Sequence, residues 1–264
     1  MRAIILAAGK GERLKEITST IPKPMIEIMG KPVLEYNINW LNRYDIKDIY
    51  INLHHLPEVI KDYFKDGSRW GARITYSYET KLLGTAGAVR KIAEEYWHLR
   101  TDNYYLSDAY KDLRDSKEQK GKDTFIVVYG DNLFEYDLKE ILDFHKRKNG
   151  IATIAVYEKN DVSQSGIVLL GNDDKILKFI EKPKPEEIVS HIVSTGIYIL
   201  EPAVLKYIPS DKKVDFGKEI FPEMIQNGEN IFGVIVKGDL TAIDTPELLK
   251  EALRIIEKRK RRMK

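Results

Sequence analysis

The residues best suited to chemistry lie at the start of the chain. Gly9 and Gly11 are separated by one residue, and glycines at this spacing let a backbone turn sharply and point its N–H groups at an anion. Lys10 and Arg13 add positive charge beside those donors, and Lys23 stands between two prolines ten residues after Arg13. A polyphosphate in this loop would meet backbone donors, a planar guanidinium and an ammonium group.

Two common phosphate-binding patterns do not fit this stretch. The dinucleotide-binding pattern needs a third glycine or an alanine where this chain has Leu14. The P-loop pattern needs four residues between its glycines, followed by Gly-Lys-Ser/Thr. The alternative that stays open is a purely structural glycine turn without a ligand.

A second candidate for chemistry is Asp131, which follows the apolar run at 124–128. Ligands in α/β sheets bind at the carboxyl ends of parallel strands. A carboxylate there, beside a phosphate-binding loop, is suited to hold Mg²⁺ through oxygen. The alternative is a Gly-Asp pair that only forms a turn.

The elements that must position these residues alternate along the first half of the chain. Apolar runs predict strands, and apolar residues at helical spacing predict helices. The predicted strands are 3–8, 25–28, 47–51, 73–78, 124–128, 151–157, 165–169, 175–180, 191–200 and 231–236, and the predicted helices are 32–43, 56–64, 84–95, 137–147, 216–225 and 246–259. This order predicts an α/β fold with a Rossmann-like mixed, mainly parallel sheet flanked by helices.

Composition and one unusual stretch narrow the class of protein further. Residues 97–123 are polar and charged, and we expect a solvated insertion there. A hydrophobic content of 43% suffices for a core, and a net charge of +2 gives no general attraction to nucleic acid. Because cysteine is absent, disulfides and thiolate metal sites are excluded. The chain shows no long apolar run and no leader pattern, so we expect a soluble cytoplasmic protein with no membrane partner.

The combination L-A-A-G-x-G-x-R-L followed by P-K-P resembles the signature of the sugar-1-phosphate nucleotidyltransferases, also called nucleotide-sugar pyrophosphorylases. The segment L-G-T-A-G-A at 83–88 is closest to mannose-1-phosphate guanylyltransferase-like members, although it also suits an ordinary glycine-rich helix start. The resemblance implies a GT-A-like fold, a single domain over 1–264 without the C-terminal β-helix that many members add. Residues 1–150 would hold the nucleotide and residues 151–264 the sugar phosphate.

The resemblance also implies roles for individual residues. Lys23 would stabilise charge at the α-phosphate, and Arg13 would hold the departing β- and γ-phosphates. The nucleotide-binding candidates are Leu6, Ala7, Ala8, Gly9, Lys10, Gly11, Glu79, Gly84 and Thr85. The sugar-phosphate candidates are Asn132, Gly166, Glu181, Lys182, Thr195 and Gly196.

The metal ligands implied by the resemblance are Asp131 and Asp244. Many members read D-[IV]-G-T-P-E, with the second aspartate three residues before the threonine, where this chain has Ala242. Related cytidylyltransferases read I-D-T-x-E, which matches Asp244. A helix cap at Asp244 or Thr245 is the alternative.

The reaction implied is Mg²⁺-dependent nucleotidyl transfer from an NTP to a sugar 1-phosphate, most like that of a mannose-1-phosphate guanylyltransferase. Glucose-1-phosphate thymidylyl- or uridylyltransfer and cytidylyltransfer to a polyol or amino-alcohol phosphate stay open. So does a non-catalytic regulatory subunit that binds a nucleotide-sugar. The expected partners are the NTP and the sugar 1-phosphate but no nucleic acid, and a homo-oligomer is compatible with the sequence.

Overall fold

The computed structural model describes residues 1–97, 123–238, 240–243, 245–250 and 252–254. The chain forms two compact units, each assembled from stretches that lie far apart in the sequence. We call Ala3–Lys81, Tyr129–Tyr136 and Gly238–Lys264 the N-terminal unit, and Met1–Arg2, Leu82–Val128 and Asp137–Lys237 the strand-rich unit. The predicted insertion falls almost wholly on 98–122, outside the described residues.

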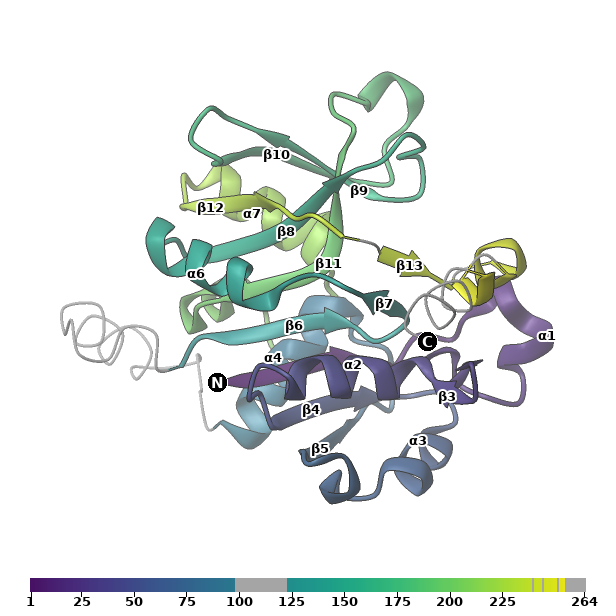
Figure 1. Cartoon of the computed structure of the whole chain (residues 1–264). Coiled ribbons are helices and arrows are strands. Elements are labelled where there is room, and N and C mark those ends of the chain that lie inside the picture. The colour runs from purple at the N-terminus through teal and green to yellow at the C-terminus, as the bar shows by residue number, and fades with distance from the viewer. Residues whose placement is uncertain (98–122, 239, 244, 251, 255–264) are drawn as a thin grey trace. The chain divides into compact units, whose positions relative to one another are not determined.

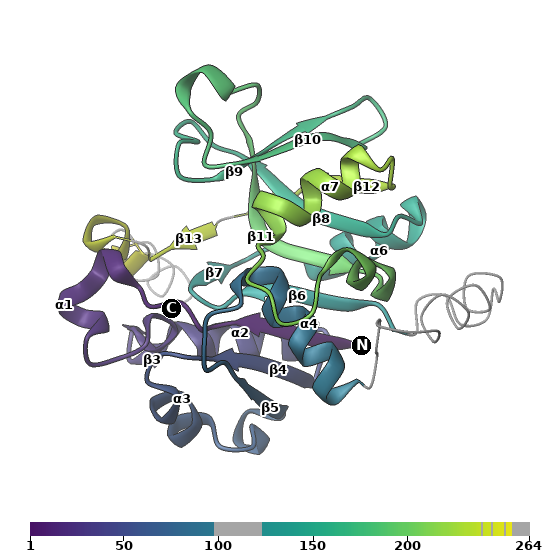
Figure 2. The same cartoon turned by 180° about the vertical axis from the view of Figure 1, so that it is seen from behind.

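The N-terminal unit is built around strands β1, β4 and β5, which are neighbours in that order. Its elements are β1 (Arg2–Leu6), η1 (Glu12–Leu14), α1 (Lys15–Thr18), η2 (Lys23–Met25), β2 (Glu27–Ile28), β3 (Lys31–Pro32), α2 (Val33–Asn42), β4 (Asp48–Leu53), α3 (Pro57–Phe64), η3 (Ser68–Trp70), β5 (Arg73–Tyr78), β7 (Asn132–Phe134) and β13 (Leu240–Ala242). Strands β4 and β5 are parallel, whereas β7 and β13 form an antiparallel pair. Helix α2 crosses in front of β1 and β4 in Figure 1 and behind them in Figure 2.

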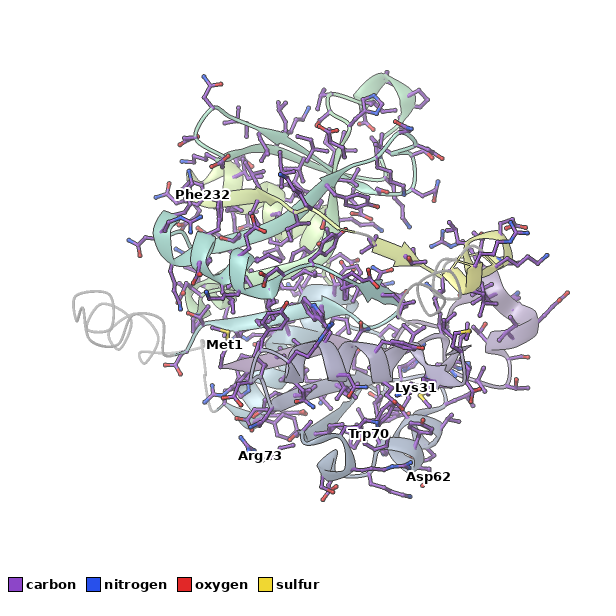
Figure 3. The ribbon with its side chains drawn as sticks, viewed as in Figure 1. Met1, Lys31, Asp62, Trp70, Arg73 and Phe232 are labelled. Carbon is purple, nitrogen blue, oxygen red and sulfur yellow. The ribbon has the colours of Figure 1, made fainter. Side chains whose placement is uncertain are left out.

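The core of this unit follows the apolar pattern of the sequence. Ile4 and Ile5 of β1 and Ile49 and Ile51 of β4 are fully buried. At the edge of the unit, the ring of Trp70 packs against Tyr63 and Phe64, with centroids 5.5 and 4.8 Å apart. Lys31 pairs with Glu35 at 2.9 Å. Figure 3 labels Trp70 and Lys31 among the side chains of this unit.

The strand-rich unit is centred on β11. Its elements are α4 (Gly84–Tyr96), β6 (Phe125–Tyr129), α6 (Leu138–Lys148), β8 (Ala152–Glu158), β9 (Gly166–Leu170), β10 (Ile176–Glu181), η4 (Pro185–Glu187), β11 (Ile192–Leu200), η5 (Pro202–Tyr207), η6 (Phe216–Ile220), α7 (Phe221–Gln226) and β12 (Ile231–Ile235). Strand β11 pairs antiparallel with β6, β8 and β9, while β12 runs parallel to β8. Helices α6 and α7 lie on opposite faces of these strands (Figures 1 and 2).

The predicted fold class is confirmed, since a mixed sheet is flanked by helices. The described β4–β5 and β8–β12 pairs are parallel, whereas β11 pairs antiparallel with β8. Three details differ from the sequence prediction. The predicted strand 25–28 is reduced to β2, because residues 23–25 form a tight turn, and η6 begins residues 216–225 as a π-helix. The pairing of β7 with β13 was not predicted.

Two further predictions are tested only in part or not at all. The last helix is seen at 246–250 and 252–254, and the rest of 246–259 lies outside the described residues. The division of one domain into functional halves at residue 150 stays a prediction. None of the described helices has the length and apolar character needed to cross a membrane.

Candidate active site

The exit of β1 into the glycine loop is fixed by a buried polar chain in the N-terminal unit. The Ala7 N–H donates to Oδ1 of Asn52 at 2.7 Å, and Nδ2 of Asn52 donates to Oε1 of Glu79 at 2.7 Å. Asn52 lies on β4, Glu79 directly follows β5, and they are only 4% and 1% exposed. Buried polar groups are stable when they are hydrogen-bonded. The predicted nucleotide residues Ala7 and Glu79 are therefore connected through Asn52, which was not among the predicted site residues.

The two glycines of the loop differ in their backbone conformation and in the space around them. Gly11 has φ +64°, and a Cβ there would lie 2.7 Å from Cγ2 of Thr18. The Thr18 hydroxyl donates to the carbonyls of Gly11 and Leu14 at 3.0 Å, closing the loop on itself. By contrast, a Cβ at Gly9 would meet nothing within 4 Å. Gly11 is thus required by the fold, whereas Gly9 leaves open backbone that a ligand can approach.

A buried lysine and a strand-end carboxylate form the charged centre of this unit. Nζ of Lys23 lies 2.5 Å from Oδ2 of Asp131, and Lys23 is 6% exposed. The turn η2 holds Lys23, since the Met25 N–H donates to the Pro22 carbonyl at 2.8 Å. The Gly130 N–H donates to the carbonyl of Leu6 at 2.9 Å, which places Asp131 next to the end of β1. The structure therefore brings the glycine loop, Lys23 and Asp131 together.

The other predicted residues of the N-terminal unit lie around this centre. Lys10 and Arg13 are exposed on the loop. Asn132 begins β7 and is paired in register with Ala242 of β13. Asp244, the second predicted metal ligand, lies outside the described residues. No group of three or more His, Cys, Asp or Glu side chains within the described ranges is placed to hold a metal.

In the strand-rich unit, Glu181 and Gly166 face each other across the antiparallel pair of β9 and β10. Oε2 of Glu181 occupies the space beside two glycines. A Cβ at Gly166 would lie 2.8 Å from this oxygen, and a Cβ at Gly217 would lie 2.7 Å from it. Among the described residues, no hydrogen-bond donor reaches this half-buried carboxylate. It is therefore an acceptor that a hydroxyl-bearing ligand could satisfy.

The surroundings of Glu181 shift the pKa of its carboxyl group upward. Burial raises the pKa of this carboxyl above its ordinary value, and the nearby charge of Asp215 raises it further. Lys182 and Lys218 act in the opposite direction. Lys182 is exposed, with φ +51°, and its N–H donates to the Ser165 carbonyl at 3.0 Å.

The predicted sugar-binding pair Thr195 and Gly196 shapes a bulge in β11. The Thr195 hydroxyl donates to the Ala155 carbonyl at 2.9 Å and accepts from the Ile197 N–H at 3.2 Å. Gly196 has φ +80°, and the register of β11 against β8 breaks between Ser194 and Tyr198. The hydroxyl of Thr195 is thus already used inside the protein, so a ligand contact here falls to the backbone.

The predicted nucleotide residues Gly84 and Thr85 begin helix α4. The N–H and the hydroxyl of Thr85 both donate to Oδ1 of Asp215, at 3.1 and 3.2 Å. The Phe216 N–H donates back to the Thr85 hydroxyl at 2.9 Å. Gly84 has φ +75°, and a Cβ there would lie 2.4 Å from the Val214 carbonyl oxygen. Much of the glycine pattern at 83–88 is therefore explained by close packing against residues 212–216.

The predicted site residues thus form two sets. The N-terminal unit holds Leu6, Ala7, Ala8, Gly9, Lys10, Gly11, Arg13, Lys23, Glu79, Asp131 and Asn132, and the strand-rich unit holds Gly84, Thr85, Gly166, Glu181, Lys182, Thr195 and Gly196. Sequence reasoning missed Asn52, Asp215 and Gly217. Asn52 gave one signal, as a polar residue directly after the predicted apolar strand 47–51, whereas Asp215 and Gly217 look like an ordinary helix start.

The chain is similar in sequence to known nucleotidyltransferases. A family model described as Nucleotidyl transferase matches residues 2–240. The chain is 40% identical over 245 residues to a UTP–glucose-1-phosphate uridylyltransferase of Synechocystis sp., covering 89% of this chain and 58% of that protein. It is 31% identical over 257 residues to a probable mannose-1-phosphate guanylyltransferase 1 of Oryza sativa subsp. japonica, covering 97% of this chain and 64% of the relative. The chain therefore spans about three fifths of the length of these curated relatives.

A solved structure resembles the chain over almost its whole length. The structure of HddC from Yersinia pseudotuberculosis complexed with GMP-PN matches with a TM-score of 0.74 and 24% identity, covering 97% of this chain and 99% of that one. At this level of identity the likeness concerns the fold.

Proposed function

The chain belongs to the nucleotidyl transferase family, and from that premise we propose that it transfers a nucleotidyl group from an NTP to a sugar 1-phosphate. The products would be an NDP-sugar and pyrophosphate. The family resemblance drawn from the glycine loop and P-K-P is confirmed by the match over residues 2–240. The observation that best supports the activity is the buried Lys23 paired with Asp131 at the end of β1, beside the open backbone of Gly9.

The chemistry needs no protein nucleophile. A phosphate oxygen of the sugar 1-phosphate attacks the α-phosphorus in line, and the bond from that phosphorus to the oxygen bridging to the β-phosphate breaks. Pyrophosphate leaves with the electron pair of that bond. Because the attacking phosphate is already an anion, catalysis consists of positioning and charge neutralisation.

Most of the predicted site residues of the N-terminal unit would act on the nucleotide in this proposal. The Lys23 ammonium would stabilise charge at the α-phosphate. Arg13 and Lys10, exposed on the loop, would hold the departing β- and γ-phosphates together with the backbone N–H groups at Gly9 and Gly11. Leu6, Ala7, Ala8 and Glu79 would lie against the nucleoside.

The donor set fits Mg²⁺. Mg²⁺ is commonly held by one or two carboxylates and completed by substrate phosphates. Oδ2 of Asp131 contacts Lys23, while Oδ1 has no partner among the described residues. Asp131 would hold the ion, with Asp244 as the proposed second ligand. When bound, Mg²⁺ would neutralise phosphate charge.

The strand-rich unit would supply recognition of the sugar phosphate. Glu181 would accept from sugar hydroxyls, and Lys182 would pair with the phosphate. Gly166 and the bulge at Gly196 would let the backbone approach the sugar. Asn132 of the N-terminal unit is a further proposed sugar-phosphate contact, and Gly84 and Thr85 are proposed nucleotide contacts.

Two substrate pairs have support. GTP with mannose 1-phosphate is favoured by the L-G-T-A-G-A segment and by the guanylyltransferase relative. UTP with glucose 1-phosphate is favoured by the 40% identity to the uridylyltransferase. A cytoplasmic location stays a prediction.

The decisive experiment is a panel of pyrophosphate-release assays. It combines four NTPs with mannose 1-phosphate, glucose 1-phosphate and a polyol phosphate, with and without EDTA. We expect turnover with GTP and mannose 1-phosphate that EDTA abolishes. Turnover only with CTP and the polyol phosphate would select the cytidylyltransferase alternative. Binding of NDP-sugars by calorimetry without turnover of any pair would select the regulatory-subunit alternative.

A further inference from the structure

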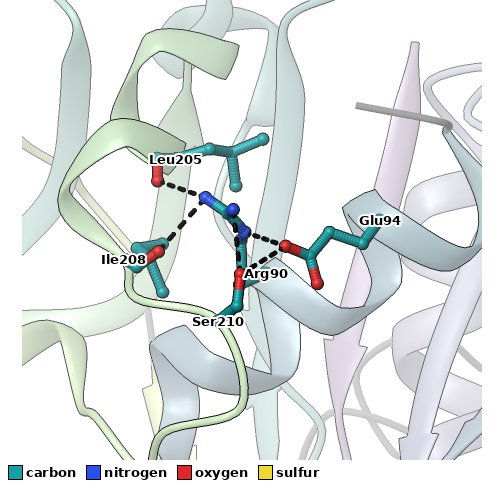
Figure 4. A network of polar contacts seen from close by, with 5 residues as sticks. All are labelled: Arg90, Glu94, Leu205, Ile208 and Ser210. Atoms are coloured by element: carbon teal, nitrogen blue, oxygen red, sulfur yellow. Dashed lines mark hydrogen bonds and ion pairs between the residues drawn. The ribbon is translucent and has the colours of Figure 1, made fainter. Parts of the chain in front are cut away.

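Helix α4 carries a stretch of chain, residues 205–217, which we call the α4-bound segment. Arg90, 2% exposed, donates to the carbonyls of Leu205 and Ile208 at 2.9 and 3.2 Å and to the Ser210 hydroxyl at 3.0 Å. Its Nε pairs with Glu94 at 2.5 Å (Figure 4). A buried guanidinium is stable only when its donors are used, so this network fixes the first part of the segment.

The next part of the segment is held by the backbone at the start of α4. The Val214 carbonyl accepts from the N–H groups of Ala86 and Gly87 at 3.0 and 3.2 Å. A Cβ at Gly84 would lie 2.4 Å from the Val214 oxygen, and one at Gly87 would lie 2.5 Å from the Lys212 oxygen. Because these neighbours are backbone atoms, they have little freedom to move aside. The segment is thus seated on α4 at close range.

The segment ends beside Glu181. A Cβ at Gly217 would lie 2.7 Å from Oε2 of Glu181 and 2.9 Å from Cε1 of Phe179. Gly217 lies in the π-helical turn η6 and is buried, and its φ is outside the left-handed region. Its backbone conformation therefore suits any residue, and the space occupied by the Glu181 carboxylate and the Phe179 ring is what excludes a side chain.

We propose that Gly217 is a positioning residue for the sugar-phosphate site, acting by leaving the space that the Glu181 carboxylate occupies. The contacts of Arg90, Gly84 and Gly87 with the α4-bound segment hold Gly217 at this place. This inference rests on the proposed function, in which Glu181 accepts from sugar hydroxyls.

The test is Gly217→Ala, assayed with the substrate pair that the wild type turns over. The added methyl group displaces the carboxylate and weakens a charge-assisted hydrogen bond, so we expect the KM for the sugar 1-phosphate to rise roughly 10-fold or more. The KM for the NTP should stay within about twofold, well below the tenfold change that a lost charged hydrogen bond implies. Gly233→Ala is the matched control, because its Cβ would crowd the Leu170 side chain at 2.6 Å and its nearest atoms are all aliphatic.

A double-mutant cycle separates positioning from general damage. If Gly217 acts through Glu181, the substitution should have no further effect on the sugar-phosphate KM in a Glu181→Ala background. The inference is overturned by an unchanged sugar-phosphate KM in Gly217→Ala, or by a full additional loss in that background.

Two further measurements separate failure of this inference from an unfolded variant and from failure of the proposed function. If Gly217→Ala alone unfolds, every variant of the cycle is made in a Phe179→Leu background. This substitution removes the ring atoms that the new methyl group would meet. Wild-type protein that turns over no pair, yet binds sugar 1-phosphate by calorimetry, would reject the proposed function alone, and the cycle would then be read from dissociation constants. A wild type that binds no sugar phosphate would reject both.

Discussion

The glycine loop of the N-terminal unit differs in its charge balance from the Glu181 cluster of the strand-rich unit, by which we mean Glu181, Gly166, Gly217 and Asp215. In the loop, the buried Lys23 is neutralised by Asp131 before any ligand arrives. In the cluster, Glu181 lies near Asp215, lacks a hydrogen-bond donor among the described residues, and has a raised pKa. An anionic ligand must therefore compete with Asp131 for Lys23, whereas a hydroxyl ligand fills an unused acceptor. This difference supports the proposal that the loop binds the phosphates and the cluster binds the sugar hydroxyls.

The two regions also differ in how they are assembled. The loop is closed by residues near in sequence, as in the contacts of Thr18 with Gly11 and Leu14. The cluster combines β9, β10 and η6, and the contact of Thr85 with Asp215 spans 130 residues. Substitutions in the loop should therefore act locally, whereas those in the cluster should act through the packing of distant segments.

The largest effect is expected at the charged centre of the loop. Asp131→Asn keeps an oxygen that can accept from Lys23 but removes the charge that would hold Mg²⁺, so kcat should fall by about 100- to 1000-fold or more. The melting temperature should also fall, because the buried Lys23 ammonium loses its charged partner, so kcat is measured well below the melting temperature of the variant. Asp123→Asn is the matched control, because Asp123 is an exposed carboxylate at the other end of β6. Near-normal kcat of Asp131→Asn at saturating Mg²⁺ would contradict the metal role.

The next effect tests whether the two regions bind different substrates. Lys182→Ala should raise the KM for the sugar 1-phosphate roughly 10- to 100-fold while leaving NTP binding nearly unchanged, because one charge-assisted contact is lost. Arg13→Ala should instead damage NTP use and kcat. Lys184→Ala and Lys15→Ala are the exposed-lysine controls. A Lys182→Ala variant that loses NTP affinity, measured by calorimetry, would assign the wrong substrate to this lysine.

A smaller effect separates the two glycines of the loop. Gly11→Ala forces a side chain into the left-handed region and against Thr18, so the free energy of unfolding should fall by about 1–2 kcal/mol. Gly9→Ala should leave stability unchanged, because its Cβ meets nothing, but should raise the KM for the NTP. Urea unfolding and steady-state kinetics measure both. Equal stability losses in the two variants would show that the loop is only a structural turn.

The sequence predicted the loop better than the cluster for a physical reason. Gly9, Gly11 and Lys23 act through short-range backbone geometry, so their types and spacing carry the information. The order of strands and helices was likewise readable from local apolar periodicity. These signals suffice for the fold class and for the anion-binding end of the proposed site.

Asn52, Asp215 and Gly217 were not predictable in the same way. Their roles depend on tertiary contacts with Ala7, Thr85 and Glu181, which no local pattern records. The interpretation of L-G-T-A-G-A as nucleotide contact also missed that Gly84 and Gly87 are needed for the backbone at 212–214. A glycine pattern alone does not say whether the close neighbour is a ligand or the chain itself.

The smallest effect concerns pH and tests how much the charge of Asp215 contributes to the pKa of Glu181. Burial, and then Asp215, raise the pKa of Glu181, so its carboxyl takes up a proton at a higher pH than an ordinary carboxyl would. If the ionised form accepts from the sugar, the sugar-phosphate KM should rise severalfold as pH falls through that raised pKa. Asp215→Asn removes the neighbouring charge but keeps an oxygen for Thr85, so the midpoint should move to lower pH, while Lys182 and Lys218 continue to favour the ionised form.

The control for this pH dependence is Glu181→Gln, which retains only the titration of the substrate phosphate, whose second pKa is about 6. The wild-type profile divided by the Glu181→Gln profile isolates the titration of Glu181. A midpoint that stays in place in Asp215→Asn would show that burial, opposed by Lys182 and Lys218, sets the pKa of Glu181 without a contribution from Asp215. Asp215 would then act in the cluster through its hydrogen bonds with Thr85 rather than through its charge.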